Sequence, residues 1–140
     1  MTADDRHLGF AAILYAAGLF LHTADHFRRG LDTVTPWVLW AGNVSTGIGV
    51  LAVALVLTRH RLAPLVAAVT GLPIAIGVAA VHLLPHWSEL SDPFPGAHGT
   101  GVTALSWSVV LIEIVGALAL GVAGAIEMRH EVPRARERAG

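Results

Sequence analysis

Four long apolar runs, separated by short polar segments, organise this chain of 140 residues. They cover about residues 8–27, 37–58, 62–84 and 103–126. Each run is close to the roughly 20 residues that an α-helix needs to cross the hydrocarbon core of a bilayer. Because a bilayer core cannot satisfy backbone N–H and C=O groups, such runs cross it as helices. The pattern predicts an all-α, polytopic membrane protein whose single domain, residues 1–140, is a four-helix transmembrane bundle.

The placement of arginine along this pattern predicts the orientation of the bundle. Seven of the nine arginines would lie at the N-terminus, after the second run or in the C-terminal tail, and only Arg28 and Arg29 on the other side. Because positive residues favour the cytoplasmic side, we expect both termini in the cytoplasm of a bacterium and the bundle in its inner (plasma) membrane. Residues 85–102 would form an external loop, and residues 127–140 a cytoplasmic tail that is partly disordered after Pro133.

Composition agrees with this class of protein. Hydrophobic residues make up 54% of the chain and charged residues 14%, whereas about a quarter of the residues in soluble domains are charged. The acidic leader MTADDRH and the absence of a cleavage site after the first run favour a retained helix over a signal peptide. A net charge of −1 gives no reason to expect a nucleic-acid partner. The partner expected from the apolar runs is the lipid bilayer. The absence of cysteine excludes disulfides and thiolate metal sites.

Two histidine-containing segments, HTADH and HLLPH, end the first and third runs at matching predicted depths. Residues at i, i+3 and i+4 share one face of a helix, so His22, Asp25 and His26 would lie together. His82 and His86 would share a face if the helix continues past the proline between them. If the two faces turn toward each other, four imidazoles and one carboxylate meet near the outer face of the membrane.

A metal ion is the ligand that best suits this set of side chains. Imidazole and carboxylate ligands suit zinc, iron, copper(II) and nickel, and we expect zinc or iron. The predicted ligands are His22, His26, His82 and His86, with Asp25 either a further ligand or the hydrogen-bond partner of one. An open coordination position would activate water for hydrolysis or support redox chemistry, whereas a closed site would brace the two helices.

Further polar residues lie close to these histidines in the predicted bundle. Glu113 lies about ten residues into the fourth run, where a charged side chain is costly and normally faces the bundle interior. We expect it to act with Asp25 as a catalytic acid or base, and an interhelical hydrogen bond is the alternative. Asn43 and Asp92 are possible polar partners of the site. His98, in a glycine-rich loop, is expected to be solvated.

Two other functions fit the same pattern. The first is electron transfer by haem b, held by one histidine from each of the first and third helices. The second is a non-catalytic accessory subunit of a larger membrane complex. Its partner, or a second copy of this chain, would pack on a stripe of small residues formed by Ala117, Gly121 and Ala125. The same stripe could instead serve helix packing within the bundle.

The size and helix count resemble those of small four-helix membrane proteins of bacteria, including the DoxX-like group. The H-x3-H spacing at 82–86 is similar to the histidine motifs of membrane fatty-acid hydroxylases. The H-x2-H-H motif that those hydroxylases use in addition is absent from this chain. Neither resemblance assigns a role to a residue.

Overall fold

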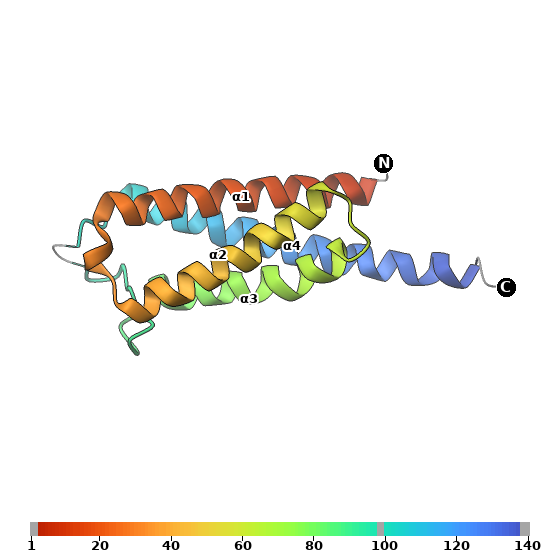
Figure 1. Cartoon of the computed structure of the whole chain (residues 1–140). Coiled ribbons are helices and arrows are strands. Elements are labelled where there is room, and N and C mark those ends of the chain that lie inside the picture. Colours follow the sequence, from red (N-terminus) through yellow and green to blue (C-terminus); the bar gives the residue numbers. More distant parts are fainter. Residues whose placement is uncertain (1–2, 98–99, 138–140) are drawn as a thin grey trace.

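The described part of the chain, residues 3–97 and 100–137, is all-helical in this computed structural model (Figure 1). A short 3-10 helix, Leu31–Thr33, links the first two helices. Within the described ranges there is no strand. All four α-helices are long and apolar enough to cross a membrane, which agrees with the predicted fold class. These helices are α1 (Ala3–Arg29), α2 (Pro36–Leu57), α3 (Ala63–Leu83) and α4 (Ala104–Glu137).

The helix boundaries match the apolar runs closely for α2 and α3, while α1 and α4 extend beyond theirs. α1 begins at Ala3, before the first apolar run, and α4 continues to Glu137 instead of ending near Ile126. The backbone is therefore helical where the sequence predicted partial disorder after Pro133. The reason is that the polar segment after Ile126 is rich in Glu, Arg and Ala, which are strong helix formers without being apolar.

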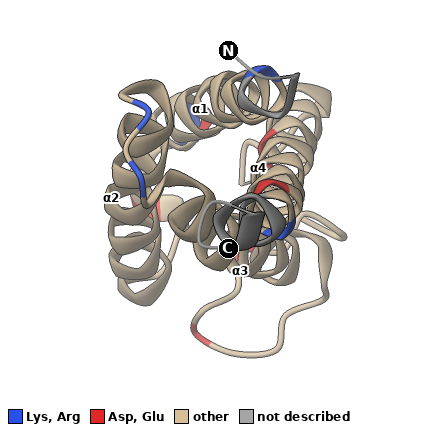
Figure 2. Cartoon of the chain, turned by 90° about the vertical axis from the view of Figure 1, so that its right-hand side faces the viewer, with Lys and Arg blue, Asp and Glu red and all other residues tan. Residues whose placement is uncertain are grey.

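Around the bundle axis the helices follow the order α1, α4, α3, α2, so that α1 and α3 are diagonal neighbours across the centre (Figure 2). Small residues let α4 approach its two neighbours closely. A Cβ atom at Gly116 would lie 2.7 Å from the Cα atom of Tyr15, and one at Gly71 would lie 2.6 Å from the carbonyl oxygen of Ala117. Gly121 is equally close to α3. The predicted stripe on α4 therefore packs, at Ala117 and Gly121, inside the bundle.

α2 packs against the bundle mainly along its second half. Gly49, Ala52 and Val56 are buried, whereas Val38 is the one buried residue between Pro36 and Ile48. Thr35 caps the helix by accepting a hydrogen bond from the Val38 amide at 3.2 Å. The first half of α2 therefore lies apart from the bundle centre and leaves room beside it.

The two ends of the bundle differ in composition. α1 and α3 both finish at one end, which we call the histidine end and define by Arg29 and Leu83. The start of α1, the far end of α4 and the turn between α2 and α3 lie at the opposite end (Figure 1). Figure 2 faces this opposite end, where Arg59 and Arg61 are exposed in the turn.

Candidate metal centre

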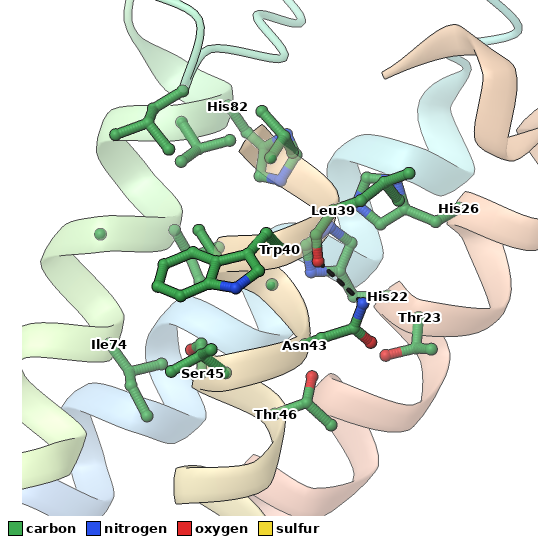
Figure 3. A pocket seen from close by; sticks show the side chains of 18 of the residues that line it. His22, Thr23, His26, Leu39, Trp40, Asn43, Ser45, Thr46, Ile74 and His82 are labelled. Atoms are coloured by element: carbon green, nitrogen blue, oxygen red, sulfur yellow. Dashed lines mark hydrogen bonds between the residues drawn. The ribbon is translucent and has the colours of Figure 1, made fainter. Parts of the chain in front are cut away.

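Three of the four predicted histidine ligands form a cluster at the histidine end. His22 and His26 come from α1 and His82 comes from α3, and one potential ligand atom of each lies within 4.8 Å of the others. The ring centroids are 4.7 Å apart for His22 and His26, and 4.8 Å apart for His22 and His82. His22 and His82 are buried, and His26 is half-buried. Figure 3 shows the three rings beside one another in the wall of a pocket.

The sequence positions of these residues explain why they meet. His22 and His26 are one helical turn apart, so both point from the same face of α1. His82 lies one residue before the end of α3. Because α1 and α3 both run toward the histidine end and are diagonal neighbours, their inward faces meet in the bundle centre.

The His22 ring is held from α4. Its Nδ1 atom is hydrogen-bonded to Oε2 of Glu113, whose residue exposure is only 2%, and Nδ1 is the donor to the ionised carboxylate. A neutral imidazole that donates from Nδ1 carries its lone pair on Nε2. The Nε2 atom of His22 is buried and has no hydrogen-bond partner among the described residues. A carboxylate on the far nitrogen is the usual way in which proteins orient a metal-binding histidine.

The His82 ring is held by the segment that follows α3. Its Nδ1 atom lies 3.0 Å from the backbone carbonyl oxygen of Asp92. Because a carbonyl only accepts hydrogen bonds, Nδ1 must be the donor and Nε2 carries the lone pair of the neutral ring. The Phe94 amide also donates to the His82 carbonyl oxygen at 2.9 Å, so this segment covers the end of the helix. Asp92, which the sequence indicated as a possible partner, thus contacts His82 through its backbone carbonyl oxygen and through its carboxylate, whose Oδ2 atom lies 3.5 Å from Nδ1.

A buried ion pair fixes this segment to α1. Nη2 of Arg29 donates to both carboxylate oxygens of Asp92, at 2.9 and 2.7 Å, and the side chains are 1% and 6% exposed. The Arg29 guanidinium carbon also lies 5.2 Å from the centre of the Phe94 ring. This pairing was not predicted from the sequence. The available signal was that Arg29 and Asp92, which carry opposite charges, each follow one of the two histidine segments.

His86 does not share a face with His82, because the helix that would carry both ends at Leu83. A proline disfavours helical backbone in the residue before it, and Leu84, which precedes Pro85, is extended with φ −85° and ψ 154°. His86 is exposed and lies outside the histidine cluster. The expectation that His86 would be a fourth ligand therefore depended on a helix that does not form.

Asp25 is buried and lies between the two α1 histidines in the sequence, but it is not part of the cluster. Its Oδ1 atom accepts a hydrogen bond from Nε of Arg28 at 2.7 Å. Nη2 of Arg28 in turn donates to Oγ of Ser106 at 3.1 Å, so this pair faces the start of α4. The reason is angular: at 100° a residue, Asp25 is rotated about 60° from His22 and about 100° from His26. His98 lies outside the described residues.

A pocket of about 580 Å³ lies beside the histidines, between α1, α3 and the first half of α2. Most of its wall is apolar, and Trp40 covers part of it in Figure 3. Asn43, Thr46 and Thr23 add polar groups near His22. The Asn43 amide nitrogen donates to the Leu39 carbonyl oxygen at 2.9 Å rather than to a histidine.

Comparisons with protein-family models, with curated proteins and with solved structures found no match for this chain. The chemistry available to this chain rests on its own residues. These provide three clustered imidazoles, two of them oriented by an oxygen acceptor, and a largely apolar pocket next to them.

Proposed function

We propose that this chain is a small integral membrane protein that binds a divalent transition metal ion, zinc or iron, through His22, His26 and His82. The observation that best supports this function is the buried Nε2 atom of His22, which has no hydrogen-bond partner among the described residues. A buried polar atom without a partner costs about 1–3 kcal/mol. A metal ion bound at this atom would remove that cost.

The distances and the ligand type suit such an ion. Nitrogen atoms bound to zinc at about 2.0–2.1 Å in tetrahedral geometry lie roughly 3.3 Å apart. The potential ligand atoms here lie within 4.8 Å of one another, so modest side-chain rotations would bring them into range. Imidazole nitrogen is a common ligand of zinc and non-haem iron, and this cysteine-free chain has no thiolate to favour softer metals.

Three protein ligands leave a coordination position for an exchangeable ligand. Catalytic zinc sites have this composition, whereas structural zinc sites have four protein ligands. The neighbouring pocket has room for a molecule beside the open position, where the metal ion would act on it through activated water or through redox chemistry. In this proposal Glu113 is a positioning residue that holds His22. Asp25, which is paired with Arg28, has no catalytic role in it.

We also propose that both termini are cytoplasmic, which puts the metal centre near the outer face of a bacterial inner membrane. The histidine end has two arginines among the described residues, Arg28 and Arg29, whereas Arg6, Arg59, Arg61 and Arg129 lie at the opposite end. This asymmetry follows the preference of positive loops for the cytoplasm.

The test is metal analysis of protein purified in a mild detergent, with a Co²⁺ titration followed by visible absorption. The wild type should bind one ion per chain, and His22→Ala and His82→Ala should each lose it. His86→Ala is the matched control, because His86 is exposed and outside the cluster, and it should bind as the wild type does. Equal binding by wild type and His82→Ala would overturn the proposal. A Soret band in the purified wild type would point to haem b instead.

A further inference from the structure

We propose that the pocket beside His22, His26 and His82 binds an uncharged, lipid-soluble molecule whose one polar head group reaches the metal ion. This inference rests on the metal site proposed above and adds the class of molecule that it acts on. It depends on three properties of the pocket, namely the chemistry of its wall, its depth in the bundle and the free space inside it.

The wall favours an uncharged ligand with a small polar group at one end. Among the described residues that line the pocket there is no arginine and no aspartate, and the one carboxylate, Glu113, is bonded to His22. The polar groups gather near the histidines, where Asn43, Thr23 and Thr46 lie close to His22 (Figure 3). The rest of the wall is mainly aliphatic or aromatic. A charged molecule would lose its hydration here without gaining a charged partner.

The depth of the pocket favours a ligand that comes from the bilayer. Lining residues run along α2 from Val38 to Ile48, about 15 Å by helical rise, and Pro73 lines the pocket halfway along α3. Trp40 and Ile48 line the pocket and are still 64% and 44% exposed, so the pocket is open along α2 rather than sealed. In a transmembrane bundle this stretch of α2 lies within the hydrocarbon region.

Loop residues lie over the histidine end of the pocket. Trp87, which follows α3, lines it, and its Nε1 atom donates to the Ala80 carbonyl oxygen at 2.9 Å. Thr35, at the start of α2, donates to the Glu89 carbonyl oxygen. These bonds tie the loop to both neighbouring helices at the end that would face water. Access from the side of α2 is therefore favoured over access from the aqueous end.

Two glycines show where the chain of such a ligand would fit. Gly42 on α2 and Gly77 on α3 both line the pocket, and a Cβ atom at either would meet nothing within 4 Å. A volume of about 580 Å³ lies within the range of about 300–1,000 Å³ that is usual for small-molecule sites. A larger side chain at Gly77 should occupy this space without disturbing the helix packing.

The test uses Co²⁺-loaded protein in nanodiscs and two neutral metal-binding probes, acetohydroxamic acid and octanohydroxamic acid. Their heads are identical, and each added CH₂ that enters an apolar pocket strengthens binding about fourfold at most. Gly77→Leu should lower the affinity for octanohydroxamic acid by at least about tenfold, because the leucine fills the space of the alkyl chain. The affinity for acetohydroxamic acid should stay within about twofold of the wild-type value. Gly47→Leu is the matched control, since it also has open space but is not a lining residue, and it should change neither affinity.

The two proposals fail in different ways. If Co²⁺ binds but Gly77→Leu affects both probes alike, or neither, the lipid-soluble ligand is ruled out and the metal site stands. If the folded wild type binds no Co²⁺, the metal site fails, and photo-crosslinking with a diazirine-bearing dodecanol in phosphatidylcholine vesicles tests the pocket alone. Crosslinks to α2 that Gly77→Leu abolishes and Gly47→Leu keeps would support the ligand class, and equal crosslinking of all three proteins would overturn it.

Discussion

The Nδ1 atom of His22 on α1 is hydrogen-bonded to Oε2 of Glu113 on α4, 91 positions later in the chain. The two helix backbones are in contact at this level, because a Cβ atom at Gly18, one turn before His22, would lie 2.6 Å from the Cα atom of Glu113. The close helix packing and the orientation of the imidazole therefore depend on each other. Burying the charge of Glu113 in a membrane span would be costly, and the structure gives this side chain a specific buried partner, His22.

Replacing Glu113 should weaken metal binding without unfolding the protein, if the replacement keeps the hydrogen bond. In Glu113→Gln the amide oxygen can still accept from Nδ1 of His22, but the charge that strengthens the imidazole as a ligand is lost. We expect Co²⁺ affinity to fall about 10–100-fold, as for other residues that orient metal-binding histidines. Competition with a chromophoric chelator measures this, and circular dichroism checks the fold.

Glu113→Ala provides the comparison. It leaves a buried N–H group of His22 without an acceptor, which should lower the free energy of unfolding by about 1–3 kcal/mol in addition to weakening metal binding. If Glu113→Gln bound Co²⁺ as tightly as the wild type, the carboxylate would have no part in orienting His22 for a metal.

The Arg29–Asp92 pair should be important for both stability and the metal centre. Removing one partner from a buried, hydrogen-bonded ion pair costs about 3–5 kcal/mol, since it leaves an unpaired buried charge. Asp92→Ala should therefore lower the thermal unfolding temperature and loosen the segment whose backbone carbonyl holds His82. Thermal unfolding with and without Zn²⁺ measures both effects.

Asp32→Ala is the control for the removal of one aspartate from the same end of the bundle, because Asp32 is exposed. Its free energy of unfolding should stay within about 0.5 kcal/mol of the wild type. A double variant, Arg29→Leu with Asp92→Leu, should recover part of the lost stability by replacing both charges together. Equal stability of wild type and Asp92→Ala would show that the pair is not a structural clamp.

Much of the fold could be predicted from the sequence, because run length and composition decide how many helices are long and apolar enough to cross a bilayer. The meeting of His22, His26 and His82 was also predictable, since helical spacing and matched depth require only that two faces turn inward. His86 could not be assigned in the same way. Its place depends on where α3 ends, and a proline in a membrane helix can either end it or be tolerated.

Other features depended on helix rotation and on contacts distant in sequence. In helices that are apolar on every side, periodicity does not reveal which face is buried. The pairing of Arg29 with Asp92, 63 positions apart, follows from how the segment after α3 folds back onto α1. The pocket arises because the first half of α2 lies apart from the bundle centre. The residue types in α2 do not predict this separation.

Gly71 should be intolerant of any larger side chain, because α3 and α4 touch at this point. A Cβ atom there would lie 2.6 Å from the Ala117 carbonyl oxygen and 2.8 Å from the Cα atom of Gly121. Backbone atoms cannot move aside cheaply, so Gly71→Leu should force the helices apart and cost several kcal/mol, more than the roughly 1–3 kcal/mol usual for overpacking. Thermal unfolding in detergent tests this, with Gly9→Leu as a control, since nothing lies within 4 Å of a Cβ atom at Gly9. Similar unfolding temperatures for the two variants would contradict the close packing.

The proposed orientation can be tested directly because the chain has no cysteine, so each introduced cysteine is the one thiol in the protein. His60→Cys places it in the exposed turn between α2 and α3, and Glu89→Cys places it in the exposed loop at the histidine end. In intact bacterial spheroplasts, a membrane-impermeant maleimide should label Glu89→Cys at once and His60→Cys only after the membrane is opened. The reason is that Arg59 and Arg61 flank His60 and, together with Arg6 and Arg129, make this end richer in arginine than the histidine end, which has Arg28 and Arg29. The reverse labelling pattern would place the histidine cluster on the cytoplasmic side, and the metal ion would then have to be loaded from the cytoplasm.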